Sequence, residues 1–122
     1  MSTARRGYAH AALLALPRDA DDRAPGGAVT LALCGSWDHE PPCPLAAHRT
    51  AAVRTGDRLA VRVVFAAVPD DEARVREVVH GALAGGHCTG PNGVDTAWRL
   101  LDDGPSELRP DERALADRLG GG

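Results

Sequence analysis

The strongest constraint on the fold is an alternating run of apolar side chains at positions 59, 61, 63, 65 and 67. Alternation with a period of two is the pattern of a strand that buries one face. The Gly56-Asp57 pair before it forms a two-residue connection to residues 50–54, and its glycine can supply the positive φ of a tight turn. The sequence therefore predicts a β-hairpin whose second strand packs on the core.

A helix is predicted immediately after this hairpin. Pro69 ends the strand, and three acids at positions 70–72 suit the unsatisfied donors and the positive dipole of a helix N-terminus. Apolar residues then recur with helical spacing at Val75, Val78, Val79, Ala82 and Leu83. Gly85 supplies a stop. We expect a helix over residues 70–84 with one apolar stripe on the sheet.

The periodicities before the hairpin are shorter. Apolar side chains alternate within residues 29–33, which predicts a third strand with Cys34 on its opposite face. Residues 8–16 fit a helix or a strand, and we assign them to an edge strand because a fourth strand would cover more of the sheet. Residues 18–27 are expected to form an exposed polar loop.

Two short helices are predicted at the C-terminus. The first covers residues 94–101, with Asp95 near its start and Gly104 after its end. The second has Pro110 in its first turn, where a missing N–H is tolerated. It is followed by a glycine tail at 120–122 that we expect to be disordered.

These elements predict one α+β domain over residues 1–119. It consists of an antiparallel sheet of three or four strands, a long helix on one face and two short C-terminal helices at its edge. The chain has 122 residues, 43% of them hydrophobic and 25% charged, which is enough for one core but not for two.

The composition excludes several kinds of catalytic and binding site. All 14 basic residues are arginine, so no lysine is present for a Schiff base or for a phosphate-binding P-loop. A modest basic strip at Arg49, Arg54, Arg58 and Arg62 faces one acid, Asp57. We interpret this strip as solvated charge. We expect no nucleic-acid partner, because the strip is sparse and lacks aromatic residues for stacking.

No targeting or membrane segment is expected. The apolar residues 9–16 are too short for one, and they run into Pro17 and several acids. No other run approaches the roughly 20 residues of a membrane helix. The chain has 3 cysteines, an odd number that suits a reducing compartment better than a disulfide framework. The expectation is a cytoplasmic protein of undetermined oligomeric state.

Four potential metal ligands lie close together in sequence: Cys34, His39, Cys43 and His48. Two thiolates and two imidazoles form a set that tetrahedral zinc accepts, although the close cysteine pair of zinc fingers is missing. Prolines around Cys43 stiffen its loop. His87 or Cys88 could substitute for one ligand. The alternative is that Cys34 is a small buried apolar residue and that the histidines are exposed.

The same loop supports two further interpretations. Cys43 beside a histidine could act as nucleophile and base in a cysteine-dependent enzyme, with Asp38 or Glu40 orienting the base. Trp37, near the predicted strand end, would mark a partner surface if it were exposed.

Nothing in the sequence assigns a catalytic or cofactor-binding residue. We therefore expect a small intracellular non-enzymatic binding or adaptor protein with a protein partner. A zinc-type metal-binding protein is the alternative, and a cysteine-dependent enzyme is a distant third.

Overall fold

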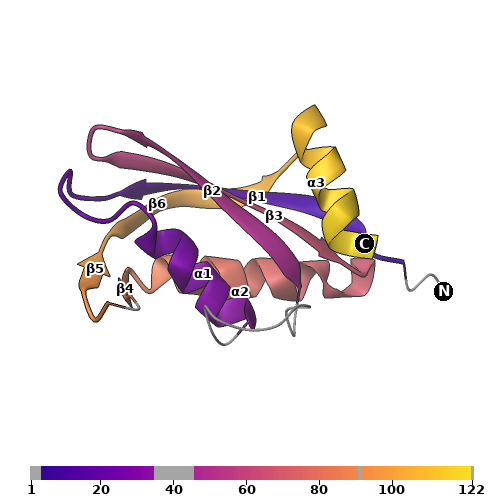
Figure 1. The fold of residues 1–122 in the computed structure, drawn as a ribbon, viewed down its shortest axis with the longest axis horizontal. Coiled ribbons are helices and arrows are strands. Elements are labelled where there is room, and N and C mark those ends of the chain that lie inside the picture. Colours follow the sequence, from indigo (N-terminus) through magenta and orange to yellow (C-terminus); the bar gives the residue numbers. More distant parts are fainter. Residues whose placement is uncertain (1–3, 35–45, 91, 122) are drawn as a thin grey trace.

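The computed structural model describes residues 4–34, 46–90 and 92–121. The elements in chain order are β1 (Arg6–Ala15), α1 (Ala24–Cys34), β2 (Ala47–Thr55), β3 (Arg58–Ala67), the 3-10 turn η1 (Pro69–Asp71), α2 (Glu72–Ala84), β4 (His87–Thr89), β5 (Asp95–Ala97), β6 (Arg99–Ser106) and α3 (Pro110–Gly121). Figure 1 shows α1 and α2 on one side of the sheet and α3 on the other side, at one end only.

Four strands form an antiparallel sheet in the order β2-β3-β1-β6, and β4 pairs with β5 separately. With α1 and α2, the chain follows a β-α-β-β-α-β path in which β3 lies between β1 and β2. This is the ferredoxin-like topology. The α+β class and the antiparallel sheet are thus confirmed. The helix arrangement differs from the prediction, because α1 precedes the hairpin and only α3 is C-terminal.

The core lies between the sheet and the first two helices. Leu14 of β1 pairs with Leu59 of β3, and both are buried against this layer together with Phe65. From α2, Val79 and Leu83 complete the same cluster. Each buried aliphatic side chain of this size contributes about 2 kcal/mol to folding before entropy is counted.

The predicted hairpin and the helix after it are confirmed. β2 and β3 pair from Thr55 and Arg58 outwards, and Gly56 between them has a φ of 63°. A side chain is disfavoured in that conformation, which explains the glycine. The apolar stripe of α2 faces the core as its spacing predicts.

The third helix packs on the opposite face of the sheet. Gly7 of β1 lies so close to α3 that a Cβ there would collide with the Cβ of Ala116. Ala66 of β3 is fully buried on the same side. The helix also runs through Gly120 to Gly121, which the sequence places in a disordered tail.

The predicted strand over residues 29–33 is wrong, because this segment belongs to α1. The Asp21 carboxylate accepts the Arg23 backbone N–H at 2.9 Å just before the helix begins, and Pro25 fits its first turn. Val29 and Leu33 are both buried with helical spacing. A short, nearly continuous apolar run carries no period that separates helix from strand.

The predicted helix over residues 94–101 is also wrong, because β5 and β6 occupy it. Its helical spacing is accidental: Trp98 separates the two strands, and the pairing of β6 with β1 skips Leu101. Trp98 is buried, and its indole N–H donates to the Leu83 carbonyl at 2.8 Å. The tryptophan thus closes the core at the end of α2.

The N-terminal segment is a strand as assigned, but not an edge strand. β1 pairs with β3 on one side and β6 on the other. Among the described residues, no helix has the length and apolar character needed to span a membrane.

Candidate functional site

In the part of the chain that the structure describes, one half of the sheet face beside α3 carries no helix (Figure 1). The strand register places Val53, Ala60, Leu13 and Asp102 in one row across all four strands. The next row includes Ala51 and Ala11. Val53 is 67% exposed and Leu13 is 40% exposed, although both lie in strands. We call this surface the open half-face: Ala11, Leu13, Ala51, Val53, Ala60 and Asp102.

The open half-face is smooth and shallowly hollowed. Ala11, Leu13 and Ala60 line a groove of about 390 Å³ that Asp102 and Gly104 of β6 close on one side. Small side chains at its floor leave the strands accessible to a flat partner surface. A contiguous exposed apolar surface is a feature of interaction sites.

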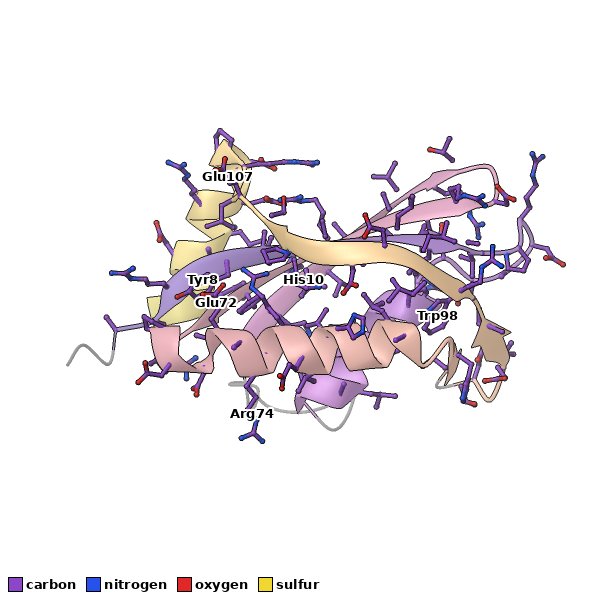
Figure 2. All side chains as sticks on the ribbon, turned by 180° about the vertical axis from the view of Figure 1, so that it is seen from behind. Tyr8, His10, Glu72, Arg74, Trp98 and Glu107 are labelled. Atoms are coloured by element: carbon purple, nitrogen blue, oxygen red, sulfur yellow. The ribbon has the colours of Figure 1, made fainter. Side chains whose placement is uncertain are left out.

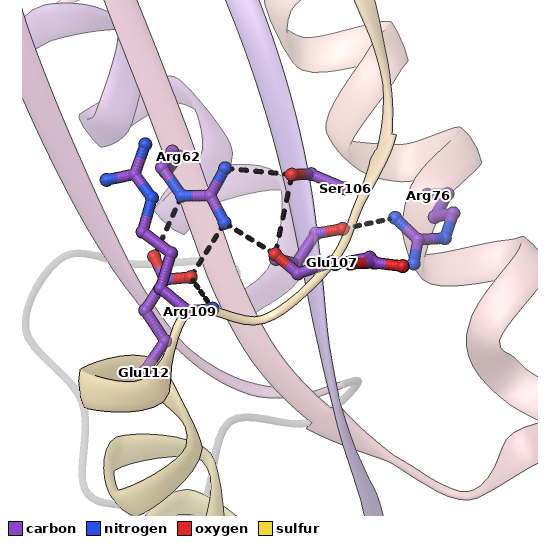
Figure 3. Close-up of polar contacts among 7 residues, drawn as sticks. Arg62, Arg76, Ser106, Glu107, Arg109 and Glu112 are labelled. Carbon is purple, nitrogen blue, oxygen red and sulfur yellow. Dashed lines mark hydrogen bonds and ion pairs between the residues drawn. The ribbon is translucent and has the colours of Figure 1, made fainter.

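An ion pair fixes the border between this surface and α3 (Figure 3). Arg62 of β3 donates to Glu112 at 2.8 and 2.6 Å and to the Ser106 hydroxyl at 2.9 Å. The Arg109 backbone N–H also donates to Glu112. The hydrogen bonds from Arg62 lower the pKa of Glu112 to about 2, against the opposing effect of burial.

Only part of the predicted basic strip is solvated charge. Arg62 is held by Glu112, and Arg54 donates to the carbonyls of Leu16, Pro17 and Ala20. Arg54 thereby ties the loop after β1 to the hairpin. These two arginines hold parts of the fold together, and Arg62 also lies between Ala51 and Ala11 in the second row of the open half-face.

A second polar cluster lies on the helix side of the sheet (Figure 2). Glu72, Arg76 and His80 follow one another at intervals of four along α2, so they share one side of the helix. Arg76 donates to Glu72 at 2.8 Å and to the Ala9 carbonyl at 2.8 Å. Its guanidinium also stacks over the rings of Tyr8 and Phe65.

This cluster continues through His10 to Asp103. Arg76 donates to His10 Nδ1 at 3.2 Å, so the opposite ring nitrogen carries the proton and donates to Asp103 at 2.8 Å. His80 Nδ1 donates to the same carboxylate at 2.9 Å. Burial raises the pKa of Asp103, but the hydrogen bonds from His10 and His80 outweigh it and hold the pKa below its ordinary value.

The carboxylate orients His80 as a carboxylate orients a general base in hydrolases. Within the described parts of the chain, however, no serine, threonine or cysteine side chain contacts His80. The described residues therefore supply no nucleophile to this cluster. It links α2 to β1 and β6.

Most of the predicted metal ligands fall outside the described residues. This applies to His39, to Cys43 and to the side chain of Cys34, whose backbone ends α1. Trp37, which the sequence predicts to mark a partner surface, also lies outside the described residues. Among the described residues, no group of three or more histidine, cysteine or acidic side chains could hold a metal ion. The zinc hypothesis stays a prediction, which native mass spectrometry before and after a chelator tests.

The three described candidates have other contacts. His48 is hydrogen-bonded through Nε2 to the Thr30 hydroxyl at 3.0 Å and through Nδ1 to the Ala46 carbonyl at 3.2 Å. His87 lies 3.6 Å from the Asp95 carboxylate and is exposed. Burial and then the charge of Asp95 raise the pKa of the Cys88 thiol, which disfavours the thiolate that metals and electrophiles require.

Sequence reasoning missed both the open half-face and the polar cluster. Leu13 and Val53 can be assigned to the open half-face only when β1 is known to lie beside β3. The histidine at position 10 in an apolar run was the one local sign of a buried polar contact. The chain matches no protein-family model, no curated protein and no solved structure, so these surfaces alone guide the assignment.

Proposed function

We propose that this protein is a non-enzymatic binding module that docks a protein surface on its open half-face, in the first place a second copy of the same chain. The observation that carries this proposal is the exposed apolar row of Val53, Ala60 and Leu13 on a sheet that α3 covers only in part.

Charge favours a second copy over an unrelated partner. Arg99 and Asp102 of β6 pair with Ala15 and Leu13 of β1, so both lie on this face of the sheet. Both are exposed, and neither forms an ion pair with any residue that the structure describes. A two-fold axis across the strands sets Arg99 of each copy opposite Asp102 of the other, as self-complementary interfaces require.

The size of the surface predicts weak association. Four strands about 4.8 Å apart and three rows about 6.8 Å apart, the third containing Ala15 and Arg99, give a footprint of roughly 400 Å². Stable complexes bury about 800 Å² on each partner. We therefore expect a dimer that forms at high protein concentration and dissociates on dilution.

Sedimentation equilibrium with charge-swapped variants tests the proposal. Arg99→Asp and Asp102→Arg should each weaken self-association, and the double variant should restore it, because both like-charge contacts become opposite-charge contacts again. Arg74→Asp is the matched control, since Arg74 is exposed on α2 behind the other face of the sheet (Figure 2). A wild type that stays monomeric at every concentration reached, or a dimer indifferent to both swaps, would refute it.

A further inference from the structure

A separate pocket lies between the start of α1 and the β4–β5 hairpin, which are neighbours at one end of the molecule (Figure 1). Its volume is about 370 Å³, within the range of small-molecule sites. Ala24 and Gly27 of α1 form one wall, and Cys88 and Thr96 form the opposite wall. It does not involve the open half-face.

Thr96 is the reason to assign a ligand to this pocket. The residue is 7% exposed, and it pairs across the hairpin with Cys88, which is equally buried. The Thr96 hydroxyl has no hydrogen-bond partner among the described residues. It is not fully enclosed either, because every fully enclosed side-chain oxygen or nitrogen in the described chain has a partner. The hydroxyl is therefore partly accessible, and the pocket is a cavity that Thr96 lines.

A hydroxyl in such a position favours occupation by a hydrogen-bonding molecule. A polar group that is nearly buried and unpaired costs free energy that a ligand atom can recover. Val94 at the rim is 57% exposed, so a ligand with an apolar body would also cover its side chain.

The charges at the mouth restrict the kind of ligand. Asp21 and Arg23 line the pocket and form a two-point ion pair with each other at 3.1 and 3.3 Å. Their charges offset each other, so neither is left unpaired for a charged ligand, and the negative charge of Asp95 near Cys88 further disfavours an anion. The remaining lining is small and largely apolar, with the amide of Asn92 turned to the backbone N–H of Val94.

We infer that this pocket binds a small neutral molecule with an apolar body and one hydroxyl or carbonyl group, which is held by the hydroxyl of Thr96. The site lies apart from the proposed dimer surface, so either assignment can fail without the other.

Amide chemical-shift titration of the full chain tests the inference with three probes: phenol, benzene and benzoate. Phenol carries the apolar body and the hydroxyl, benzene lacks the hydroxyl, and benzoate carries a charge. Phenol should shift the amides of Ala24, Cys88 and Thr96 in a saturable manner and bind most tightly of the three. Phenol binding no tighter than benzene, or benzoate binding tightest, would overturn the assigned ligand class.

Two variants locate the contact. Thr96→Val preserves the shape, so it should weaken phenol binding roughly threefold to tenfold and leave benzene unchanged. Thr89→Val is the control, because Thr89 is exposed on the other side of β4 and bonds Asp95. Ala24→Leu should fill the pocket and abolish binding of both molecules. Wild-type affinity in Thr96→Val or in a folded Ala24→Leu would refute the site.

Discussion

The buried histidine at position 10 shows how single residues decide the packing of this fold. Its neighbours Ala12 and Leu14 on the same side of β1 are buried and apolar, whereas His10 is 4% exposed and polar. It is tolerated because Arg76 and Asp103 satisfy both ring nitrogens. A buried polar group is stable only when such partners are present.

Replacing Asp103 should therefore be costly. Asp103→Ala leaves the ring N–H groups of His10 and His80 without their acceptor, and we expect a loss of about 3 kcal/mol in the free energy of unfolding. Urea denaturation at low protein concentration measures it. Asp102→Ala, at the exposed neighbouring position, should change stability by less than about 0.5 kcal/mol. Equal effects of the two substitutions would contradict the role given to the cluster.

The Arg62–Glu112 pair predicts a specific loss of stability in acid. The pKa of Glu112 falls from 4.5 in the unfolded chain to about 2 in the folded protein. Because the folded pKa is the lower one, the contribution is complete above about pH 4.5 and disappears as the pH falls towards about 2. It amounts to roughly 3 kcal/mol.

Glu112→Gln removes this titration, so its stability should fall less steeply than that of the wild type across the same interval. Urea midpoints measured from neutral to acidic pH give the comparison. If the urea midpoints of the two proteins fell equally steeply as the pH is lowered, Glu112 would not be the group responsible.

Residue-level roles of this kind could not be predicted from the sequence. His10 and Asp103 are 93 positions apart, and their contact exists only because β6 returns to lie beside β1. In the sequence alone, Asp103 is one of two adjacent acids, and nothing distinguishes it from its exposed neighbour Asp102.

At the scale of elements, the sequence predicted those helices and strands that have a regular apolar period and clear start and stop residues. The hairpin has an unbroken alternation and a glycine turn, and α2 has a full apolar stripe between acids and glycines. The segments 29–33 and 94–101 were misassigned for a shared reason: both are short, and each fits more than one period. Tertiary contacts then decide between helix and strand.

Two glycines test how the elements pack. Gly7→Ala should destabilise the protein by about 1–3 kcal/mol, because the added methyl group collides with Ala116 of α3. Gly81→Ala should stabilise it by up to about 1 kcal/mol, because the position is inside α2 and a Cβ there meets no atom within 4 Å. Thermal melting of both variants provides the measurement. A neutral Gly7→Ala would mean that α3 does not dock as described.

At the scale of the whole molecule, the two faces of the sheet are covered to different extents. The face beneath α1 and α2 forms the core, while α3 covers only the end of the other face near Gly7 and Ala66. Had α3 been longer or crossed the sheet diagonally, Leu13 and Val53 would be buried. Their exposure leaves this half of the sheet uncovered, which is the reason that we propose a partner there.

A dilution series monitored by amide chemical shifts tests the central claim most directly. As protein concentration rises, the signals of Leu13, Val53 and Ala60 should move along straight paths, while those of exposed α2 residues such as Arg74 and Glu77 should stay fixed. Concentration-dependent shifts confined to α2, or no shifts up to the solubility limit, would contradict docking through the open half-face.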